Sequence, residues 1–233
     1  MRRSAVRLGV PDLALLVLSI GLAITYGWVS SQFYAVGTPH WWDLPALKAS
    51  SVVLLALLAL LRGPRLLATG LAAGAVGDFL LALGGNGFMA GAMVFLLGHL
   101  AYFALFVRSG GVADRMLPQQ FRIVALVLIY GSAIVMTPLL VPGNTPLFLP
   151  LAIYTAVLAA MTAASFRLPM EYWLTMTGAV LFFISDGFVA ADMFHRVADP
   201  ALAFWRGFAG WMIYWAGQAG ICVGSLSLLT ART

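Results

Sequence analysis

Eight stretches of nearly uninterrupted apolar residues alternate with short breaks along the chain. Each stretch is close to the ~20 residues that an α-helix needs to cross the hydrocarbon core of a bilayer. The breaks, such as LRGPRL, LGGNGF and VPGNTP, carry glycines and prolines that commonly end helices. The pattern predicts an all-α polytopic membrane protein, with residues 1–233 forming one transmembrane domain, a single bundle of eight transmembrane helices. The predicted spans are 11–30, 44–62, 66–84, 88–108, 121–141, 147–167, 172–194 and 206–229.

Composition agrees with a lipid environment. Hydrophobic residues make up 62% of the chain and charged residues 9%, whereas soluble domains carry roughly 25% charged residues. The single cysteine, Cys222, has no internal disulfide partner and is expected to be a small core residue. The net charge of +5 is spread over short loops, so no nucleic acid partner is expected. The basic start resembles a signal peptide, but its long apolar run has no A-x-A pattern after it and is predicted to be the first span.

The basic residues predict the orientation, because cytoplasmic loops retain Lys and Arg. One side of the predicted bundle collects Arg2, Arg3, Arg7, Arg62, Arg65, Arg108, Arg115, Arg122, Arg167 and Arg232. The other side has Arg196 and Arg206, and Lys48 lies within a span. We therefore expect an integral protein of the bacterial inner (cytoplasmic) membrane with both termini cytoplasmic. Most aromatics flank span ends and are expected to be interfacial anchors, including Trp28, Trp41, Trp42, Trp205, Trp211 and Trp215.

Two acids interrupt the apolar runs, Asp78 in LAAGAVGDFLLAL and Asp186 in GAVLFFISDGFVAADMF. A charged side chain at the bilayer centre costs roughly 2.5 to 3.5 kcal/mol even on lenient scales, so such a residue usually faces a cavity with a function. Asp78 lies 6 residues and Asp186 8 residues from the outer end of its predicted span, or ~9 and ~12 Å in depth. The pair is predicted to be the centre of function, with a purely structural role as the alternative.

Polar residues on other spans fall at similar depth. Lys48 lies in the outer turns of the second span and His99 near the middle of the fourth. Gly70 and Gly74 precede Asp78 at intervals of four, which places all three on one helix face where a second helix can approach closely. These positions predict a pocket in the outer half of the bundle.

Two further pairs of polar residues share a helix face. His99 and Tyr102 are spaced i, i+3, and Tyr214 and Gln218 are spaced i, i+4. Simpler interpretations remain open: Lys48 can extend its amine toward the interface, His99 can be a neutral packing residue, and Tyr214 with Gln218 can only join helices.

The chain resembles a known family in several motifs. The stretches LPALKASSVVLL, GLAAGAVGDFLLAL, GFMAGAMVFLLGHLAYFALF, AIYTAVLAAM, GAVLFFISDGFVAADMF and GWMIYWAGQAG are similar to the successive signatures of the YhhN-like family, the lysoplasmalogenases. The resemblance extends from about Leu44 to Gly220, and the combination of GD, GHLAY and SD in three different spans is specific. The chain departs from the family at Ala49, where the pattern has Pro after the lysine, so a local kink is expected to be altered.

The resemblance implies hydrolysis of the vinyl ether bond of lysoplasmalogens to a fatty aldehyde and glycerophosphoethanolamine or glycerophosphocholine. By the same resemblance, Asp78 and Asp186 match the family's paired acids. Enol ether hydrolysis needs one protonated carboxyl to deliver a proton and one carboxylate to stabilise the cation or activate water. We expect Asp186 to be the acid, because its flanks Phe182, Phe183 and Ile184 are apolar, and Asp78 to be its partner.

The expected partners are a lysophospholipid substrate, water and membrane lipids. Substrate binding is predicted for Lys48, His99, Tyr102, Tyr214 and Gln218. No cofactor or metal is expected, since only His99 is intramembrane while His40 and His195 fall in loops. Serine hydrolase, nucleotide-binding and H-E-x-x-H motifs are absent from the sequence.

Two other classes of function remain open. The alternative to an enzyme is a proton-coupled carrier or binding protein for lysolipids, because intramembrane acids also mark proton relays. The sequence has no clear internal repeat of the kind common in carriers, which favours the enzyme. The acids can also serve structure alone by pairing with Lys48. Head-group preference, chain length and oligomeric state are not indicated by the sequence.

Overall fold

The computed structural model describes residues 8–36, 43–84, 87–110 and 116–228. These ranges hold eight α-helices, one short 3-10 turn and no β-strand beyond an isolated bridge between Met116 and Pro169. The elements are α1 (Val10–Val36), α2 (Asp43–Arg62), α3 (Arg65–Ala82), α4 (Gly87–Ser109), α5 (Gln119–Leu140), α6 (Phe148–Ser165), η2 (Met170–Tyr172), α7 (Trp173–Phe194) and α8 (Pro200–Ser225). The predicted all-α class is confirmed.

The largest boundary differences are at the first and last helices. Helix α1 continues to Val36 rather than ending at 30. Helix α8 begins at Pro200 rather than 206, because the Asp199 carboxylate accepts a hydrogen bond of 2.8 Å from the Leu202 N–H and Pro200 occupies the first turn. A capping aspartate and a proline in the first turn are both favourable at helix starts. The sequence-based bounds missed this start because they followed hydrophobicity alone.

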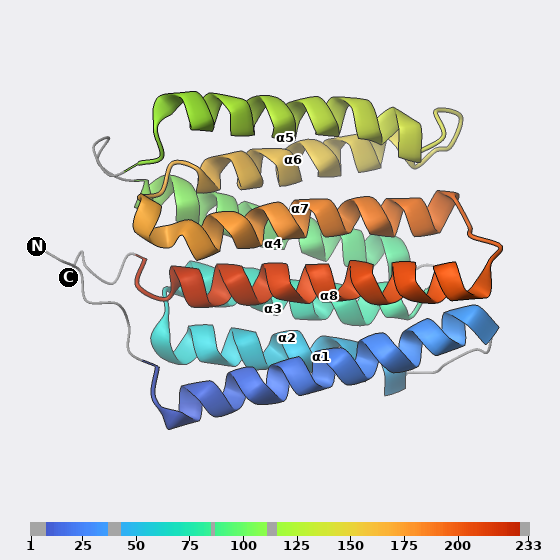
Figure 1. Cartoon of the computed structure of the whole chain (residues 1–233), viewed down its shortest axis with the longest axis horizontal. Coiled ribbons are helices and arrows are strands. Elements are labelled where there is room, and N and C mark those ends of the chain that lie inside the picture. The colour runs from blue at the N-terminus through green and yellow to red at the C-terminus, as the bar shows by residue number, and fades with distance from the viewer. Residues whose placement is uncertain (1–7, 37–42, 85–86, 111–115, 229–233) are drawn as a thin grey trace, which may run out of the picture.

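The helices have the dimensions of membrane spans. In the described part of the chain, α1 to α7 are each long and apolar enough to cross a membrane. Helix α8 is less apolar, since it contains tryptophans, glycines and a glutamine, but it has 26 residues and runs beside α7 along the bundle (Figure 1). The fold is that of a polytopic helical membrane protein.

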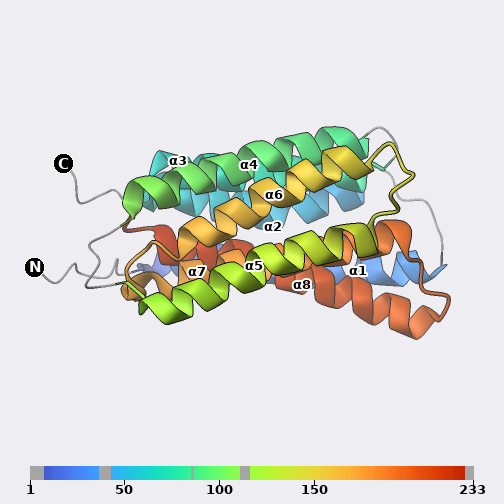
Figure 2. The ribbon, with the colours of Figure 1, turned by 90° about the horizontal axis from the view of Figure 1, so that it is seen from above.

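The helices run side by side along one long axis, with α5 and α1 at opposite edges (Figure 1). Figure 2, a view from above, shows α3 and α4 on one side of the bundle and α7 and α8 on the other. Helix α1 begins and helix α8 ends at the same end, here named the terminal end; the opposite end is named the far end. An even number of helices produces this arrangement.

Helices α7 and α8 pack with their backbones in close contact. A Cβ atom added to Gly178 would lie 2.6 Å from the Ile221 nitrogen and 2.7 Å from the Gly217 oxygen. A Cβ atom at Gly217 would lie 2.8 Å from the Phe182 nitrogen. Small residues permit such approach in membranes, where packing drives helix association. The glycines therefore fix α7 against α8 at the depth of the polar residues.

Helix α1 is tied to the bundle by two tryptophans of α8. The indole N–H of Trp211 donates to the Ala23 carbonyl at 2.8 Å, and that of Trp215 donates to the Ser19 hydroxyl at 2.9 Å. The Ser19 hydroxyl donates in turn to the Ser51 carbonyl of α2 at 2.7 Å. The expectation that Trp211 and Trp215 are interfacial anchors is wrong, because their N–H groups satisfy acceptors between helices.

The other tryptophans differ. Trp28 and Trp205 are exposed, in agreement with an interfacial position. Trp41 and Trp42 lie outside the described residues.

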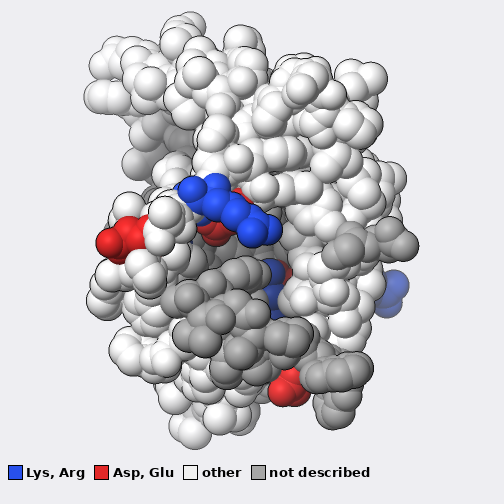
Figure 3. Space-filling model, turned by 90° about the vertical axis from the view of Figure 1, so that its right-hand side faces the viewer, with Lys and Arg blue, Asp and Glu red and all other residues white. Residues whose placement is uncertain are grey.

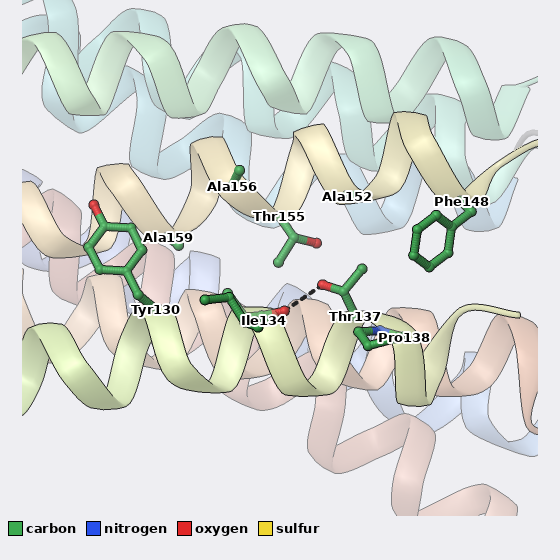
Figure 4. Close-up of a pocket in the computed structure, with 10 residues that line it drawn as sticks. Tyr130, Ile134, Thr137, Pro138, Phe148, Ala152, Thr155, Ala156 and Ala159 are labelled. Atoms are coloured by element: carbon green, nitrogen blue, oxygen red, sulfur yellow. Dashed lines mark hydrogen bonds between the residues drawn. The ribbon is translucent and has the colours of Figure 1, made fainter. Parts of the chain in front are cut away.

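Helix α5 packs loosely. Its buried residues are Ile129 and Ala133, and most of its other side chains face outward. A largely apolar cleft of about 350 Å³ separates it from α6 (Figure 4). The cleft is lined by Tyr130, Ala133, Ile134, Thr137, Pro138, Phe148, Ala152, Thr155, Ala156 and Ala159. None of the predicted site residues lines it.

Charges divide between the two ends. Arginines of the described chain at the terminal end are Arg62, Arg65, Arg108, Arg122 and Arg167. Arg196 and Arg206 lie at the far end, where Arg206 forms an ion pair with Asp192. The remaining predicted terminal-end arginines, Arg2, Arg3, Arg7, Arg115 and Arg232, lie outside the described residues.

Candidate active site

Asp78 has both carboxylate oxygens occupied. The Lys48 ammonium lies 3.2 Å from Oδ1, and the Tyr214 hydroxyl donates to Oδ2 at 2.7 Å. These partners come from α2 and α8, so the carboxylate of α3 joins three helices. Its side chain is 2% exposed. A buried carboxylate needs such compensation, because an uncompensated charge is costly away from water.

Two further predicted site residues support Tyr214. The Gln218 amide donates to the Tyr214 hydroxyl at 3.0 Å, and the Tyr102 hydroxyl donates to the Gln218 oxygen at 2.7 Å. All three side chains are buried. Gly74 makes room for this chain of bonds, since a Cβ there would lie 2.7 Å from the Gln218 nitrogen. The glycine face predicted on the third span thus packs against Tyr102 of α4 and Gln218 of α8.

Lys48 is directed inward. Its amine contacts Asp78 and lies 5.4 Å from the Trp211 ring centroid and 5.9 Å from that of Tyr26. Both rings can attract the cation through their π faces. The interpretation that Lys48 extends toward the interface is wrong, although 16% of its side chain remains exposed.

Asp186 has a different environment. The Tyr154 hydroxyl donates to its Oδ2 at 2.6 Å, and Nε2 of His99 lies 2.9 Å from the Tyr154 oxygen. His99 Nε2 is 3.9 Å from the same carboxylate oxygen. The Asp186 side chain is 17% exposed, whereas that of His99 is 1% exposed. Within the described residues, no lysine or arginine lies within ion-pair distance of Asp186.

An aromatic layer separates the two acid networks. The Phe182 ring lies 5.0 Å from His99 and 5.2 Å from Tyr214, between centroids. Phe95 contacts the same two rings at 6.3 and 5.9 Å. Each network thus contacts the same two phenylalanine rings. The two acids, distant in sequence, therefore belong to adjoining networks.

The acids lie toward the far end of the bundle. Asp78 is four residues from the end of α3 and Asp186 eight residues from the end of α7, or ~6 and ~12 Å at 1.5 Å per residue. Figure 3 views the far end, where basic and acidic atoms lie together near the middle of the face and other charged atoms lie at its edges. Both acids are in the half of the bundle in which the sequence predicted them.

The YhhN family matches residues 44–225. The chain belongs to the YhhN family. It is 33% identical over 184 residues to proteins named lysoplasmalogenase from Mycobacterium bovis (strain ATCC BAA-935 / AF2122/97) and Mycobacterium tuberculosis (strain CDC 1551 / Oshkosh). Each alignment covers 74% of this chain and 68% of the relative. No solved structure matches the chain.

All seven predicted site residues lie in the part that matches the YhhN family, and so does Tyr154. The departure at Ala49 has a structural outcome. Helix α2 runs without interruption through Lys48 and Ala49, and the Lys48 amine still reaches Asp78. The absence of the family's proline therefore does not prevent the ion pair.

Tyr154 is the residue that sequence reasoning missed in this YhhN-family chain. It joins His99 of α4 to Asp186 of α7 from α6. A tyrosine in an apolar span is usually a packing or interfacial residue. Only its depth, six residues inside α6, signalled that the hydroxyl needs a partner within the protein.

The two acids can perform different chemistry. Asp78 is a charge-compensated carboxylate, which can stabilise positive charge that develops nearby. Asp186 has one oxygen bonded to Tyr154, and no hydrogen bond to its other oxygen occurs among the described residues. A carboxyl group with an accessible oxygen can deliver or accept a proton.

Proposed function

We propose that this YhhN-family protein is a lysoplasmalogenase-type hydrolase that cleaves the vinyl ether bond of lysoplasmalogens. The products are a fatty aldehyde and glycerophosphoethanolamine or glycerophosphocholine. The names of the two mycobacterial relatives support the substrate class. The observation that carries the mechanism is the contrast between the two acids: Asp78 has both oxygens engaged, and Asp186 has one.

The reaction begins with Asp186 as general acid. Its proton is transferred to the β carbon of the vinyl ether, where the π electrons form the new C–H bond, and the O–H electron pair stays on the carboxylate. An oxocarbenium ion results, and the Asp78 carboxylate stabilises its positive charge. Proton delivery by a positioned acid accounts for about 10²- to 10⁴-fold of such a rate.

Water completes the hydrolysis. Its oxygen attacks the α carbon of the oxocarbenium ion, and one of its protons returns to Asp186. The hemiacetal then collapses: the hydroxyl proton moves to the glycerol oxygen, the carbon–oxygen bond to glycerol breaks, and the aldehyde leaves. Asp186 ends the cycle protonated, so no cofactor is required by the balance of atoms.

The other polar residues divide by exposure. Lys48 has accessible surface and is the predicted binding residue best placed to meet the substrate phosphate. Tyr102 and Gln218 are buried and act through Tyr214, which holds Asp78. His99 acts through Tyr154. Direct substrate binding by any of these five residues remains a prediction.

Replacing either acid by its amide tests the proposal. We expect Asp78→Asn and Asp186→Asn each to lower aldehyde release from a lysoalkenyl lipid by at least about 10²-fold, since each removes a charge or a proton that the reaction needs. Products are measured by mass spectrometry with purified protein in detergent, using matched alkenyl, alkyl and acyl lysolipids. Asp199→Asn is the matched control, because Asp199 is exposed and asparagine also caps helices.

The outcomes separate the classes of function. Cleavage of the alkenyl lipid alone supports the enzyme. Normal turnover in either acid variant removes that acid from the mechanism. Lysolipid flux in sealed vesicles without cleavage in detergent identifies a proton-coupled carrier instead.

A further inference from the structure

We infer that Tyr154, held by His99, determines which oxygen of Asp186 carries the acidic proton. The inference rests on the proposed function, in which Asp186 is the general acid. Tyr154 and His99 are then positioning residues, since they act through Asp186 rather than on the substrate. The observations that carry it are two contacts, Tyr154 with Asp186 and His99 with Tyr154, and one buried nitrogen of His99.

The direction of the two hydrogen bonds between His99, Tyr154 and Asp186 follows from counting donors. A tyrosine hydroxyl has a single proton to donate, and Tyr154 donates it to Asp186 Oδ2 at 2.6 Å. Toward His99, 2.9 Å away, the Tyr154 oxygen therefore accepts, and His99 Nε2 carries the hydrogen. His99 thus donates to Tyr154, and Tyr154 donates to Asp186.

The reverse direction is disfavoured by His99 Nδ1. If a proton occupied Asp186 Oδ2, Tyr154 would have to donate to His99 Nε2, and the imidazole hydrogen would move to Nδ1. Nδ1 is buried and has no hydrogen-bond partner in the described part of the chain. An N–H group there would be a buried donor without an acceptor, an arrangement that is rare in folded proteins and costly in free energy. His99 thereby keeps Oδ2 an acceptor.

The proton is left with Oδ1 of Asp186. This oxygen makes no hydrogen bond among the described residues. If it were buried, it would be a buried polar atom without a partner, and it is not one of these among the described residues. It therefore belongs to the accessible part of the side chain. The acidic hydrogen therefore lies on the accessible oxygen of the Asp186 carboxyl group.

The hydrogen bond from Tyr154 to Asp186 Oδ2 strengthens as the acidic proton leaves Asp186. Hydrogen bonds to a charged acceptor are shorter and roughly twice as strong as those between neutral groups. When Asp186 gives its proton to the β carbon, the Tyr154 hydroxyl stabilises the carboxylate that forms. Tyr154 thus lowers the energy of the transition state more than that of the ground state.

Tyr154→Phe removes only the hydroxyl. We expect kcat to fall about 10- to 100-fold with KM little changed, which corresponds to the loss of one hydrogen bond to a charged group. Tyr130→Phe is the control, since Tyr130 lies on α5 at the cleft and outside both acid networks. An unchanged kcat in folded Tyr154→Phe overturns the inference.

His99 provides a rescue test. His99→Phe preserves an aromatic ring against Phe95 and Phe182 but has no donor, and we expect it to lose kcat to the same extent as Tyr154→Phe. His99→Gln restores an N–H near the Nε2 position and should recover part of that loss. Equal activity of the two His99 variants contradicts a positioning role.

Infrared spectroscopy tests the geometry without turnover. At acidic pH, the protonated carboxyl band that disappears in Asp186→Asn should shift to higher frequency in Tyr154→Phe, because the carbonyl Oδ2 loses its donor. An unshifted band, or no such band, overturns the inference. If the wild-type protein cleaves no lysolipid but the band shifts, the proposed function fails while the role of Tyr154 in orienting Asp186 stands.

Discussion

The Lys48–Asp78 pair is an ion pair away from bulk water, and its energetics differ from those of a surface pair. Desolvating both charges offsets much of their attraction, so the intact pair contributes little net stability. Removing one partner is much more costly, because the other charge is left buried. The 3.2 Å contact and the hydrogen bond from Tyr214 give each oxygen of Asp78 a partner.

This asymmetry predicts the behaviour of Lys48 variants. Lys48→Met keeps the aliphatic stem but leaves the Asp78 carboxylate without its cation, so we expect a loss of about 3 to 5 kcal/mol in unfolding free energy. The double variant Lys48→Met with Asp78→Asn should recover most of that stability and still lack turnover. Unfolding in detergent measures both. If Lys48→Met alone were as stable as the wild type, Lys48 and Asp78 would not be electrostatically coupled.

Individual residues were predictable when their type was unusual for their surroundings. Asp78 and Asp186 stand out in apolar spans, and Lys48 and His99 stand out for the same reason. Tyr154 does not, because tyrosine is common in membrane helices. Its role depends on helix rotation, which brings its hydroxyl between His99 and Asp186. Hydrophobic periodicity gives little rotational information in helices that are apolar on all sides.

At the scale of elements, the contact between α7 and α8 holds Asp186 and Tyr214 in position. The two backbones approach so closely at Gly178 that no side-chain rotation can accommodate a larger residue, since the nearest atoms are the Ile221 nitrogen and the Gly217 oxygen. Positions of this kind are sensitive to a single methyl group.

Gly178→Ala is therefore expected to destabilise the protein by roughly 1 to 3 kcal/mol, because the two helices must separate. Gly131→Ala on α5 is the matched control: no atom lies within 4 Å of a Cβ there, and alanine is the better helix former. Thermal unfolding of both variants in detergent gives the comparison. Equal melting temperatures for the two would argue against tight α7–α8 packing.

Helix number and approximate bounds could be predicted because span length is set by the bilayer. The start of α8 could not, since it depends on the Asp199 side chain reaching the Leu202 N–H. Nor could the inward positions of Trp211 and Trp215 be predicted, because tryptophan is also common at membrane interfaces. Which acceptor an indole N–H finds depends on tertiary packing.

At the scale of the whole molecule, charge is distributed unevenly along the bundle axis. The described terminal end carries five arginines, Arg62, Arg65, Arg108, Arg122 and Arg167, and the far end carries Arg196 and Arg206. Arg206 is also paired with Asp192. We propose on this basis that the terminal end faces the cytoplasm, which places Asp78 and Asp186 in the opposite half of the membrane.

Cysteine labelling tests this orientation. Cys222, the single cysteine of the sequence, is buried and gives a low background. Asn144→Cys at the far end should react with a membrane-impermeant maleimide in intact cells, and Arg167→Cys at the terminal end should react only after the membrane is opened. Both positions are exposed. The reverse labelling pattern would invert the topology.

The packing of α1 affects how this protein should be compared with its relatives. Similarity to the family begins at residue 44, so an alignment leaves α1 outside the shared region. Yet this helix supplies the Tyr26 ring near the Lys48 amine and accepts the indole hydrogens of Trp211 and Trp215. A version trimmed to the aligned segment would open Lys48 to lipid and leave two donors unsatisfied. The smallest unit that keeps this packing is therefore larger than the region that matches the family.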